Sequence, residues 1–188
     1  MQFTGTADSY LGQLTSVLSA LDRTELENGI SQIRSAWQRG AQIITLGNGG
    51  SSLTAQHYVT DWGKMVPMKT GKPFLARSLV DNIGLIMAYG NDVSFADIFA
   101  EQLKNVLRPG DLVVAISGSG NSENVIRAVD YANENEAVTL GLCGFGGGQL
   151  RVRAQHVIWA RVEDMQMAED AHAIFGHIVT KSLCMVNY

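Results

Sequence analysis

The stretch GNGGSS at residues 47–52 decides the fold, because it follows a short apolar run and precedes a helical one. The apolar run at residues 42–46 has the β-branched content of a buried strand. The glycines of GNGGSS let the backbone close around an anion without a clash from Cβ, and the serines of this turn supply hydroxyl donors or helix caps. A strand, a glycine-rich turn and a helix in this order predict a phosphate-binding edge of a parallel sheet.

A second turn of the same kind, SGSGNS at residues 117–122, follows the apolar run 112–116 and precedes the helical pattern 122–135. The hydroxyls of Ser117, Ser119 and Ser122 and the amide of Asn121 can converge on one phosphate. Neither turn has the frame of a nucleoside triphosphate or dinucleotide loop, which disfavours those ligands. Tight turns with serine caps are the structural alternative, but two such turns at equivalent strand ends favour a phosphate site.

The rest of the chain alternates between strand and helix patterns. Apolar runs at 138–143 and 157–162 predict two further strands, and helical spacing predicts helices over 53–62, 82–90, 95–107, 122–135 and 167–186. This alternation predicts an α/β fold whose parallel sheet is covered on both faces. The polar stretch 68–72 between Pro67 and Pro73 is expected to be an exposed loop.

Two amphipathic helices are predicted ahead of this core, within residues 8–39, and Gly40 supplies the stop. The expected organisation is one domain over residues 1–188, with a helical pair at 1–40 and the α/β core at 41–188. A sheet of this size does not require the pair, so we expect it to form an oligomer surface. Packing of the pair on its own core is the alternative.

Composition narrows the classes of partner. The 188 residues are 46% hydrophobic and carry a net charge of −4 without any Lys/Arg-rich run, so one domain and no nucleic-acid partner are expected. The chain lacks an apolar run of about 18 to 20 residues and a basic region followed by an apolar one, so we expect a cytoplasmic protein with no membrane partner. Cys143 and Cys184 lack metal-type spacing and are expected to be buried free thiols.

Several motifs in order resemble one known family. GNGGSS followed by Ala55-Gln56-His57, then Asn91-Asp92, SGSGNS, the segment 143–148 and a last helix with two histidines are similar to the sugar isomerase (SIS) fold. Within that fold the chain resembles the sedoheptulose 7-phosphate isomerases, also called phosphoheptose isomerases. The resemblance covers nearly the whole chain and implies a single SIS domain with a five-stranded parallel sheet. It also implies a homotetramer with active sites at subunit interfaces.

The resemblance carries substrate roles onto individual residues. Those implied to contact the sugar phosphate are Asn48, Gly49, Ser51, Ser52, Asp92, Ser117, Ser119, Asn121, Ser122 and Asp164. The family usually has Ser-Thr-Ser in the second turn, whereas this chain has Gly118 at the middle position. One hydroxyl is therefore missing, and phosphate affinity or sugar preference is expected to differ.

Aldose–ketose isomerisation passes through an enediol and needs a base, an acid and an electrophile for the carbonyl oxygen. His57 and Asp61 are four residues apart on a predicted helix and share one face. The resemblance implies a divalent metal, zinc in some members, on His57, Asp61, Glu169 and His177, with Asp61 and His177 as the acid/base pair. Asp61 replaces a glutamate and reaches less far, while Glu169 replaces a glutamine and adds a negative charge that favours a cation.

The spacing of this metal set presents a difficulty. Glu169 and His177 are eight residues apart, a rise of about 12 Å along a helix. One ion can reach both only if Glu169 precedes the helix or the ligands come from different subunits. Glu169 and His172 chelate more naturally, so His172 is kept as an alternate ligand, beside its interpretation as a core or interface histidine. His156 is expected to be structural.

Three functional hypotheses follow. The first is an isomerase that interconverts sedoheptulose 7-phosphate and an aldoheptose 7-phosphate. The second is a noncatalytic SIS protein similar to the DnaA initiator-associating protein, a tetramer that binds another protein. The third is an isomerase for a different sugar phosphate. Noncatalytic relatives have typically lost the acidic residue after the first histidine and the last-helix histidine, and this chain retains both as Asp61 and His177.

Overall fold

The structure is a computed structural model that describes residues 5–185. Its helices are α1 (Thr6–Ala20), α2 (Arg23–Arg39), α3 (Gly49–Thr70), α4 (Ile83–Asp92), α5 (Ile98–Val106), α6 (Glu123–Glu134), α7 (Gly148–Arg153) and α8 (Met165–Cys184), with a 3₁₀ turn η1 (Phe95–Asp97) before α5. Its strands are β1 (Ile43–Gly47), β2 (Ala76–Ser78), β3 (Leu112–Ser117), β4 (Val138–Cys143) and β5 (His156–Trp159).

The five strands form one parallel sheet in the order β2-β1-β3-β4-β5. Every residue of β1 and β3 is buried, which explains why these strands read as continuous apolar runs rather than alternating ones. Ile43 pairs with Leu112 and Gly47 with Ile116, so the two central strands end side by side. The α/β class and the five-stranded parallel sheet are confirmed.

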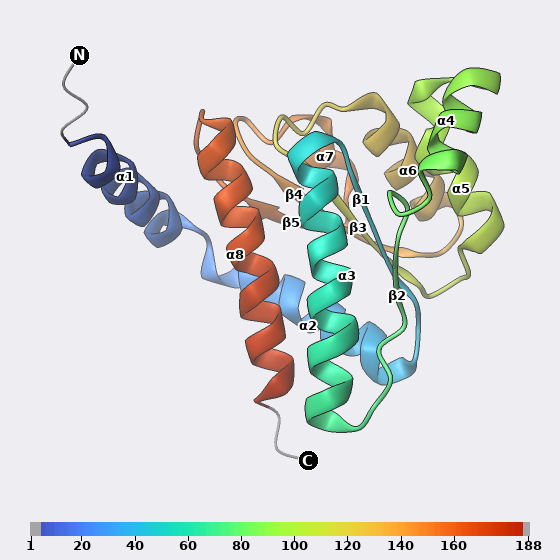
Figure 1. Cartoon of the computed structure of the whole chain (residues 1–188), viewed down its shortest axis with the longest axis horizontal. Coiled ribbons are helices and arrows are strands. Elements are labelled where there is room, and N and C mark those ends of the chain that lie inside the picture. Colours follow the sequence, from blue (N-terminus) through green and yellow to red (C-terminus); the bar gives the residue numbers. More distant parts are fainter. Residues whose placement is uncertain (1–4, 186–188) are drawn as a thin grey trace.

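Helices cover both faces of the sheet, as predicted. Residues of α2, α3 and α8 form one core with Leu112, Val114 and Leu140. Residues of α5, α6 and α7 form the second core with Val113 and Ala115, the neighbouring positions of β3 that point the other way. α3 and α8 lie side by side on the outside of the first layer (Figure 1).

The two leading helices behave differently from each other. α2 begins at the cap Asp22, whose carboxylate accepts from Thr24 N and Glu25 N, and ends at Gly40 with a φ of 72°. It packs Trp37, 2% exposed, into the core. The structure describes every residue of α1, and none of them is buried. The helix projects from the body of the protein (Figure 1). The Tyr10 hydroxyl donates to Asp170 Oδ2 at 2.6 Å and ties α1 to α8.

The predicted loop at 68–72 is wrong, because α3 continues through Pro67 to Thr70 and ends at Gly71 with a φ of 73°. Tyr58, Trp62 and Val66 are each 0% exposed and continue one buried stripe, so core packing holds the last turns despite the proline.

Two elements were not predicted, namely β2, which is three residues long, and the six-residue helix α7. The predicted end of the last helix at residue 186 lies outside the described residues, where α8 ends at Cys184.

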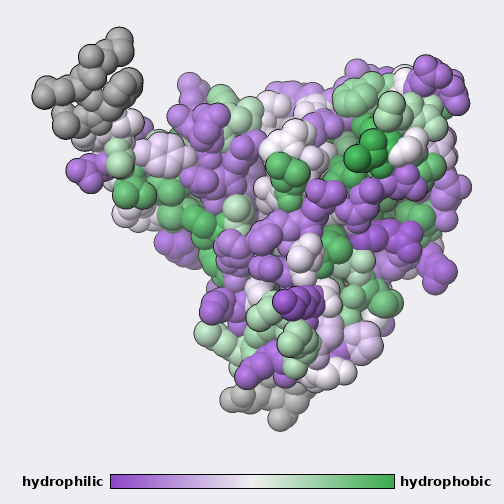
Figure 2. Space-filling model, in the orientation of Figure 1, coloured by the Kyte–Doolittle hydropathy of each residue, from purple (hydrophilic) through white to green (hydrophobic). Residues whose placement is uncertain are grey.

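The surface view in the same orientation shows polar and hydrophobic side chains interspersed over α3 and α8, with hydrophobic ones gathered over α4 (Figure 2). On and just after α4, Ile83, Met87 and Phe95 are 68%, 68% and 62% exposed. Among residues 5–185, no helix is both long enough and apolar enough to span a bilayer.

Candidate functional site

The two glycine- and serine-rich turns meet at the carboxyl ends of β1 and β3. These strands are neighbours, yet the chain goes from β1 outward to β2 on one side and resumes the sheet with β3 on the other. This reversal is the topological switch point at which open parallel sheets bind ligands. The cavity there has a volume of about 260 Å³ and is lined by Asn48, Gly49, Gly50, Ser51, Ile116, Ser117, Gly118, Ser119, Ser122, Met165 and Glu169. We call it the strand-end pocket.

A reciprocal amide pair joins the two turns. Asn48 Nδ2 donates to Asn124 Oδ1 at 2.8 Å, and Asn124 Nδ2 donates to Asn48 Oδ1 at 2.9 Å. Asn124 is 2% exposed, so losing this partner would leave its buried Nδ2 without an acceptor, although Oδ1 would still accept from Val125 N. The pair therefore fixes the distance between the turns.

The second turn is held by its own hydrogen bonds and by a close backbone contact. Ser117 Oγ donates to Ser122 Oγ at 3.2 Å, and Ser119 Oγ accepts from Asn121 N at 3.2 Å. Gly120 has a φ of 67°, and a Cβ there would lie 2.0 Å from the carbonyl oxygen of Gly147. Only glycine fits this position, because both the positive φ and the close backbone contact exclude a Cβ.

Both turns lead into helices whose first two amides have no acceptor among the described residues, whereas the third amide of α6, Val125 N, donates to Asn124 Oδ1 at 2.9 Å. The N-cap residues of α3 and α6 are Asn48 and Ser122, and neither side chain accepts a hydrogen bond from its helix in the described part of the chain. The first N–H groups of a helix lack intrahelical partners and lie at the positive end of its dipole. Two uncapped N-termini at one cavity therefore form a site for a dianion such as a phosphate ester.

The first turns of α8 form one wall of the strand-end pocket. A Cβ at Gly50 would lie 2.3 Å from Glu169 Oε1, and a Cβ at Gly118 would lie 2.3 Å from Met165 Sδ. The two glycines thus make room for these α8 side chains. The Glu169 carboxylate lies beside the N-terminus of α3, and it accepts no hydrogen bond from any described residue.

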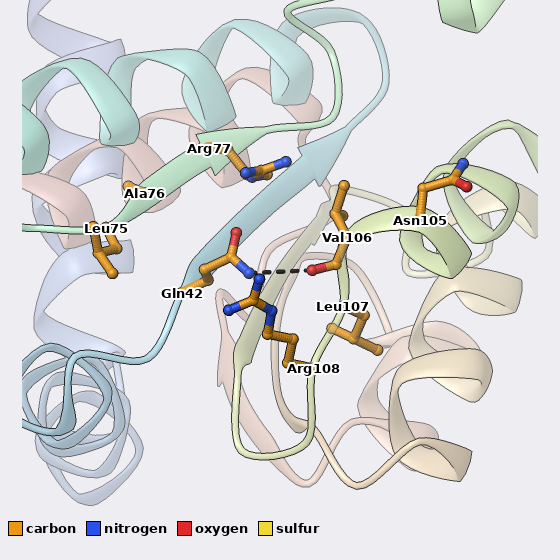
Figure 3. Close-up of a pocket in the computed structure, with 8 residues that line it drawn as sticks. All are labelled: Gln42, Leu75, Ala76, Arg77, Asn105, Val106, Leu107 and Arg108. Carbon is orange, nitrogen blue, oxygen red and sulfur yellow. Dashed lines mark hydrogen bonds between the residues drawn. The ribbon is translucent and has the colours of Figure 1, made fainter.

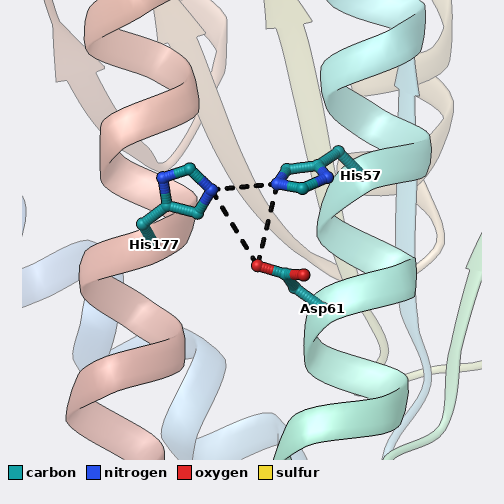
Figure 4. Close-up of side chains that lie close together, drawn as sticks. All are labelled: His57, Asp61 and His177. Carbon is teal, nitrogen blue, oxygen red and sulfur yellow. Dashed lines mark hydrogen bonds and ion pairs between the residues drawn. The ribbon is translucent and has the colours of Figure 1, made fainter.

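A second group of polar side chains lies further along the same two helices. His57 and Asp61 on α3 face His177 on α8 (Figure 4). His57 Nε2 and His177 Nε2 are 2.9 Å apart, and Asp61 Oδ2 lies 3.7 Å and 3.9 Å from them. The two histidines are exposed and Asp61 is half-buried. We call these three residues the His–Asp–His cluster.

The cluster fits a divalent metal ion. Two imidazole nitrogens and a carboxylate oxygen are ligands that zinc takes, and a tetrahedral site with bonds of about 2.0–2.1 Å places its ligand atoms roughly 3.3 Å apart. The three separations in the cluster, 2.9, 3.7 and 3.9 Å, lie on both sides of that value. Zinc could therefore bind with small side-chain movements and an open fourth position.

The structure places Glu169 and His172 apart from the cluster. Glu169 lies inside α8 and not before it, so the suggestion that it precedes the helix is wrong. Within this chain it lines the strand-end pocket instead. His172 is 1% exposed and neither ring nitrogen has a hydrogen-bond partner. Burial lowers the pKa of His172 to about 4; the backbone of Cys143, which approaches the ring without making a hydrogen bond of normal geometry, opposes that shift only partly.

Four other expected contacts do not line the strand-end pocket. Asp164 caps α8 by accepting from Met167 N at 3.0 Å, and Asp92 accepts from Asn91 Nδ2 at the exposed end of α4. Asn121 Oδ1 accepts a hydrogen bond from Gln149 N, and the Ser52 hydroxyl donates to Gly49 O at 2.7 Å. The expected free thiols are confirmed for Cys143, which is buried, and Cys184, which is half-buried.

Sequence reasoning missed Met165 and Asn124. Asn124 could have been found, because it lies two residues after the second turn and is a polar residue immediately before the apolar pair Val125 and Ile126. Met165 carried no such signal, since its role depends on how α8 docks over Gly118.

Comparison with known proteins agrees with this geometry. The fold and the paired turns at its switch point are those of a sugar isomerase domain, and residues 9–144 match the family described as SIS domain. A probable phosphoheptose isomerase of Thermoplasma acidophilum is 35% identical over 148 residues, covering 79% of this chain and 81% of the relative. The phosphoheptose isomerase of Nitratidesulfovibrio vulgaris (strain Miyazaki F) is 33% identical over 75% of this chain and 67% of its own length.

Solved structures show the same fold. A phosphoheptose isomerase from Francisella tularensis superposes with a TM-score of 0.91 at 23% identity, covering 99% of this chain and 100% of that one. The chain belongs to the phosphoheptose isomerase family of SIS domains.

Proposed function

We propose that this protein is an aldose–ketose isomerase that interconverts sedoheptulose 7-phosphate and an aldoheptose 7-phosphate through an enediol. The observation that carries the proposal is the placement of a phosphate-binding pocket and the His–Asp–His cluster on one pair of helices. The relatives named phosphoheptose isomerase support the same activity.

The separation of the two sites matches the length of the substrate. His57 follows Gly50 by seven residues, which is two turns of α3 and a rise of about 10 Å on the same face. A seven-carbon chain built from C–C bonds of about 1.5 Å is, with its phosphate ester, roughly 10 Å long. A heptose with its phosphate in the strand-end pocket can therefore present its carbonyl end to the cluster.

In this mechanism the turns bind and the cluster transfers the proton. The hydroxyls of Ser117, Ser119 and Ser122 and the first amides of α3 and α6 hold the phosphate. Asp61 keeps Oδ2 beside the histidines and leaves Oδ1 without a partner among the described residues, so Oδ1 can accept the proton from the carbon next to the carbonyl. In the metal-free site, protonated His177 supplies the proton that the carbonyl oxygen takes up as the enediol forms; with His177 Nε2 on a metal ion, the charge on that oxygen would be stabilised by the ion instead.

We also propose that His57, Asp61 and His177 hold a divalent metal ion, zinc. When bound, the ion supplies an electrophile that polarises the carbonyl oxygen. The chain itself orients these ligands: His57 and Asp61 come from consecutive turns of α3, and His177 from the neighbouring turn of α8.

Self-association into a tetramer is part of the proposal. α1 leaves Leu11 59% exposed, and Met65 and Met68 on α3 are 43% and 75% exposed near the cluster. Apolar side chains in these positions favour burial against a second copy. The exposed cluster would then be covered, as isomerisation requires protection from water.

The test is NMR of the purified protein with sedoheptulose 7-phosphate in D₂O, with zinc and with a chelator. We expect the aldoheptose phosphate to form and solvent deuterium to enter at the carbon that is deprotonated. Asp61→Asn and His177→Gln should each lower kcat at least 100-fold while phosphate binding persists. Asp130→Asn is the matched control, because this carboxylate pairs with Arg153 on the other layer and should leave kcat unchanged.

Binding of the sugar phosphate without turnover under all metal conditions would contradict the isomerase assignment and support the noncatalytic protein-binding alternative. Turnover that survives in Asp61→Asn would leave the isomerase standing and overturn the assignment of the base.

A different sugar phosphate is the second candidate, and one observation favours it. Gly118 stands where the family usually has a hydroxyl residue, and Met165 Sδ occupies the space that its Cβ would take. The phosphate end of the pocket is therefore altered. Comparing kcat/KM for five-, six- and seven-carbon ketose phosphates decides between the substrates, and a seven-carbon preference supports the first.

A further inference from the structure

A cavity of about 450 Å³ lies at the opposite edge of the sheet from the strand-end pocket. It is formed where the chain enters β1, β2 and β3, and its lining residues are Gln42, Leu75, Ala76, Arg77, Asn105, Val106, Leu107 and Arg108 (Figure 3). Ligand pockets typically measure about 300–1,000 Å³ and combine apolar walls with a few polar groups. This cavity, which we call the amino-edge cavity, has that composition.

Two arginines of the amino-edge cavity have free guanidinium groups. Arg77 on β2 and Arg108 before β3 are exposed, and neither guanidinium has a hydrogen-bond or ion-pair partner among residues 5–185. Arg127 and Arg153, by contrast, pair with Asp97 and Asp130. Arg23 also lacks such a partner among the described residues, so what distinguishes this site is that two unpaired arginines line one cavity, in a chain of net charge −4.

The negative groups nearby are already engaged. Asp111 is 4% exposed, and its Oδ1 accepts from Gln42 N at 2.9 Å. Its Oδ2 accepts from Arg108 N at 2.9 Å and Gln42 Nε2 at 3.2 Å. Gln42 Nε2 also donates to Val106 O at 3.1 Å and so covers a carbonyl at the negative end of α5. The charge that faces the cavity is therefore mainly positive.

An adjoining cavity of about 310 Å³ extends this positive edge. It shares Gln42, Leu75 and Arg108 with the first cavity and adds Arg39. Arg39 donates to Gly110 O at 3.1 Å, which holds its guanidinium at this edge of the sheet.

We propose that the amino-edge cavity is a second binding site, for a small molecule with an oxyanion group on an apolar body. The guanidinium fork matches the oxygens of phosphate and carboxylate, and it can donate two hydrogen bonds to one such group. Leu75 and Leu107 supply the apolar wall, and the Asn105 amide, which donates to Tyr89 Oη and Glu101 O, forms part of the lining. The site is separate from the strand-end pocket and does not depend on the isomerase activity.

The experiment is a titration of the ¹⁵N-labelled full chain with phenyl phosphate, followed by NMR of arginine Nε–Hε and side-chain amide signals. Arg77, Arg108 and Asn105 should shift together, with a Kd on the order of 1 mM. Arg77→Gln/Arg108→Gln should weaken this binding at least ten-fold. A parallel titration with benzoate distinguishes the sources of the oxyanion: comparable shifts identify a carboxylate ligand as sufficient, and much weaker ones identify a phosphate ester.

Controls separate this site from other anion binding. Ser119→Ala should weaken binding in the strand-end pocket and leave the Arg77 and Arg108 shifts intact. Arg23→Gln/Arg161→Gln removes the same two charges away from the cavity and should leave the affinity unchanged. Shifts confined to the strand-end turns, or equal losses in both arginine pairs, would overturn the proposal.

Discussion

His172 is expected to make the free energy of unfolding depend on pH, and His172→Leu should remove that dependence. The side chain is 1% exposed and neither ring nitrogen has a hydrogen-bond partner. Burial lowers the pKa of His172 from 6.5 to about 4. The unfolded chain therefore binds one more proton than the native chain between these two values, and protonation favours unfolding.

The sign and size follow from this difference. Because the folded pKa lies below the unfolded one, the stabilising contribution is complete above pH 6.5 and declines as the pH falls toward 4. At 1.36 kcal/mol per pKa unit, the loss is about 2 kcal/mol at pH 5 and about 3 kcal/mol at pH 4. The native protein should thus lose stability in mild acid partly through this one side chain.

Urea unfolding of the wild type and His172→Leu from pH 7.5 to pH 4, at one fixed protein concentration, measures this loss. Carboxylates contribute to the acid response of both proteins, so the difference between the two curves isolates His172. We expect that difference to change by about 3 kcal/mol in favour of the variant as the pH falls. Parallel curves would refute the reasoning, since they would mean that the native imidazole titrates as it does in the unfolded chain.

Three further outcomes are expected at the functional site. Zinc at 100 times its Kd should stabilise the protein by about 2.7 kcal/mol, which raises Tm by roughly 5–10 °C in a thermal melt. Asp61→Asn should abolish most of this rise in Tm, and an unchanged rise would place the metal elsewhere. Asn48→Ala should lower the free energy of unfolding in urea by about 1–3 kcal/mol, because it leaves Asn124 buried without its side-chain partner. The double variant Asn48→Ala/Asn124→Ala should lose less than the sum of the two single variants, and strict additivity would contradict the coupling. Glu169→Gln should tighten inorganic phosphate binding about five-fold by calorimetry, because a carboxylate that lines the same pocket repels the anion by about 1 kcal/mol at an effective dielectric between those of protein and water. Weaker binding would show that Glu169 does not face the phosphate.

Local sequence signals determined the sheet and the turns. Apolar runs identified β1, β3 and β4, because strands buried on both faces need mostly apolar side chains. They also identified most of β5, although only Ile158 of that strand is fully buried. Gly40 ended its helix as predicted, since only a residue without Cβ adopts its φ of 72° easily. Each of these features depends on the residues of one short segment, so a sequence read in windows could find them.

Local signals failed where tertiary packing was stronger. Pro67 and the polar residues after it indicated a loop, but the buried stripe of Trp62 and Val66 against the core extends α3 to Thr70. β2 has only three residues and one of them is Arg77, so no apolar run marked it. It is a strand because β1 offers a free edge for backbone pairing.

By itself the sequence determined the parallel α/β fold, the positions of the two glycine- and serine-rich turns and the residue types at the candidate site, because strand burial, glycine conformation and helix spacing are local properties. The tertiary structure decided which side chains meet. Packing of α8 against α3 brings His177 to His57 and Asp61, and the eight-residue rise along α8 takes Glu169 to the strand-end pocket instead. Contacts between helices more than a hundred residues apart depend on how the core fills, and no single segment encodes that.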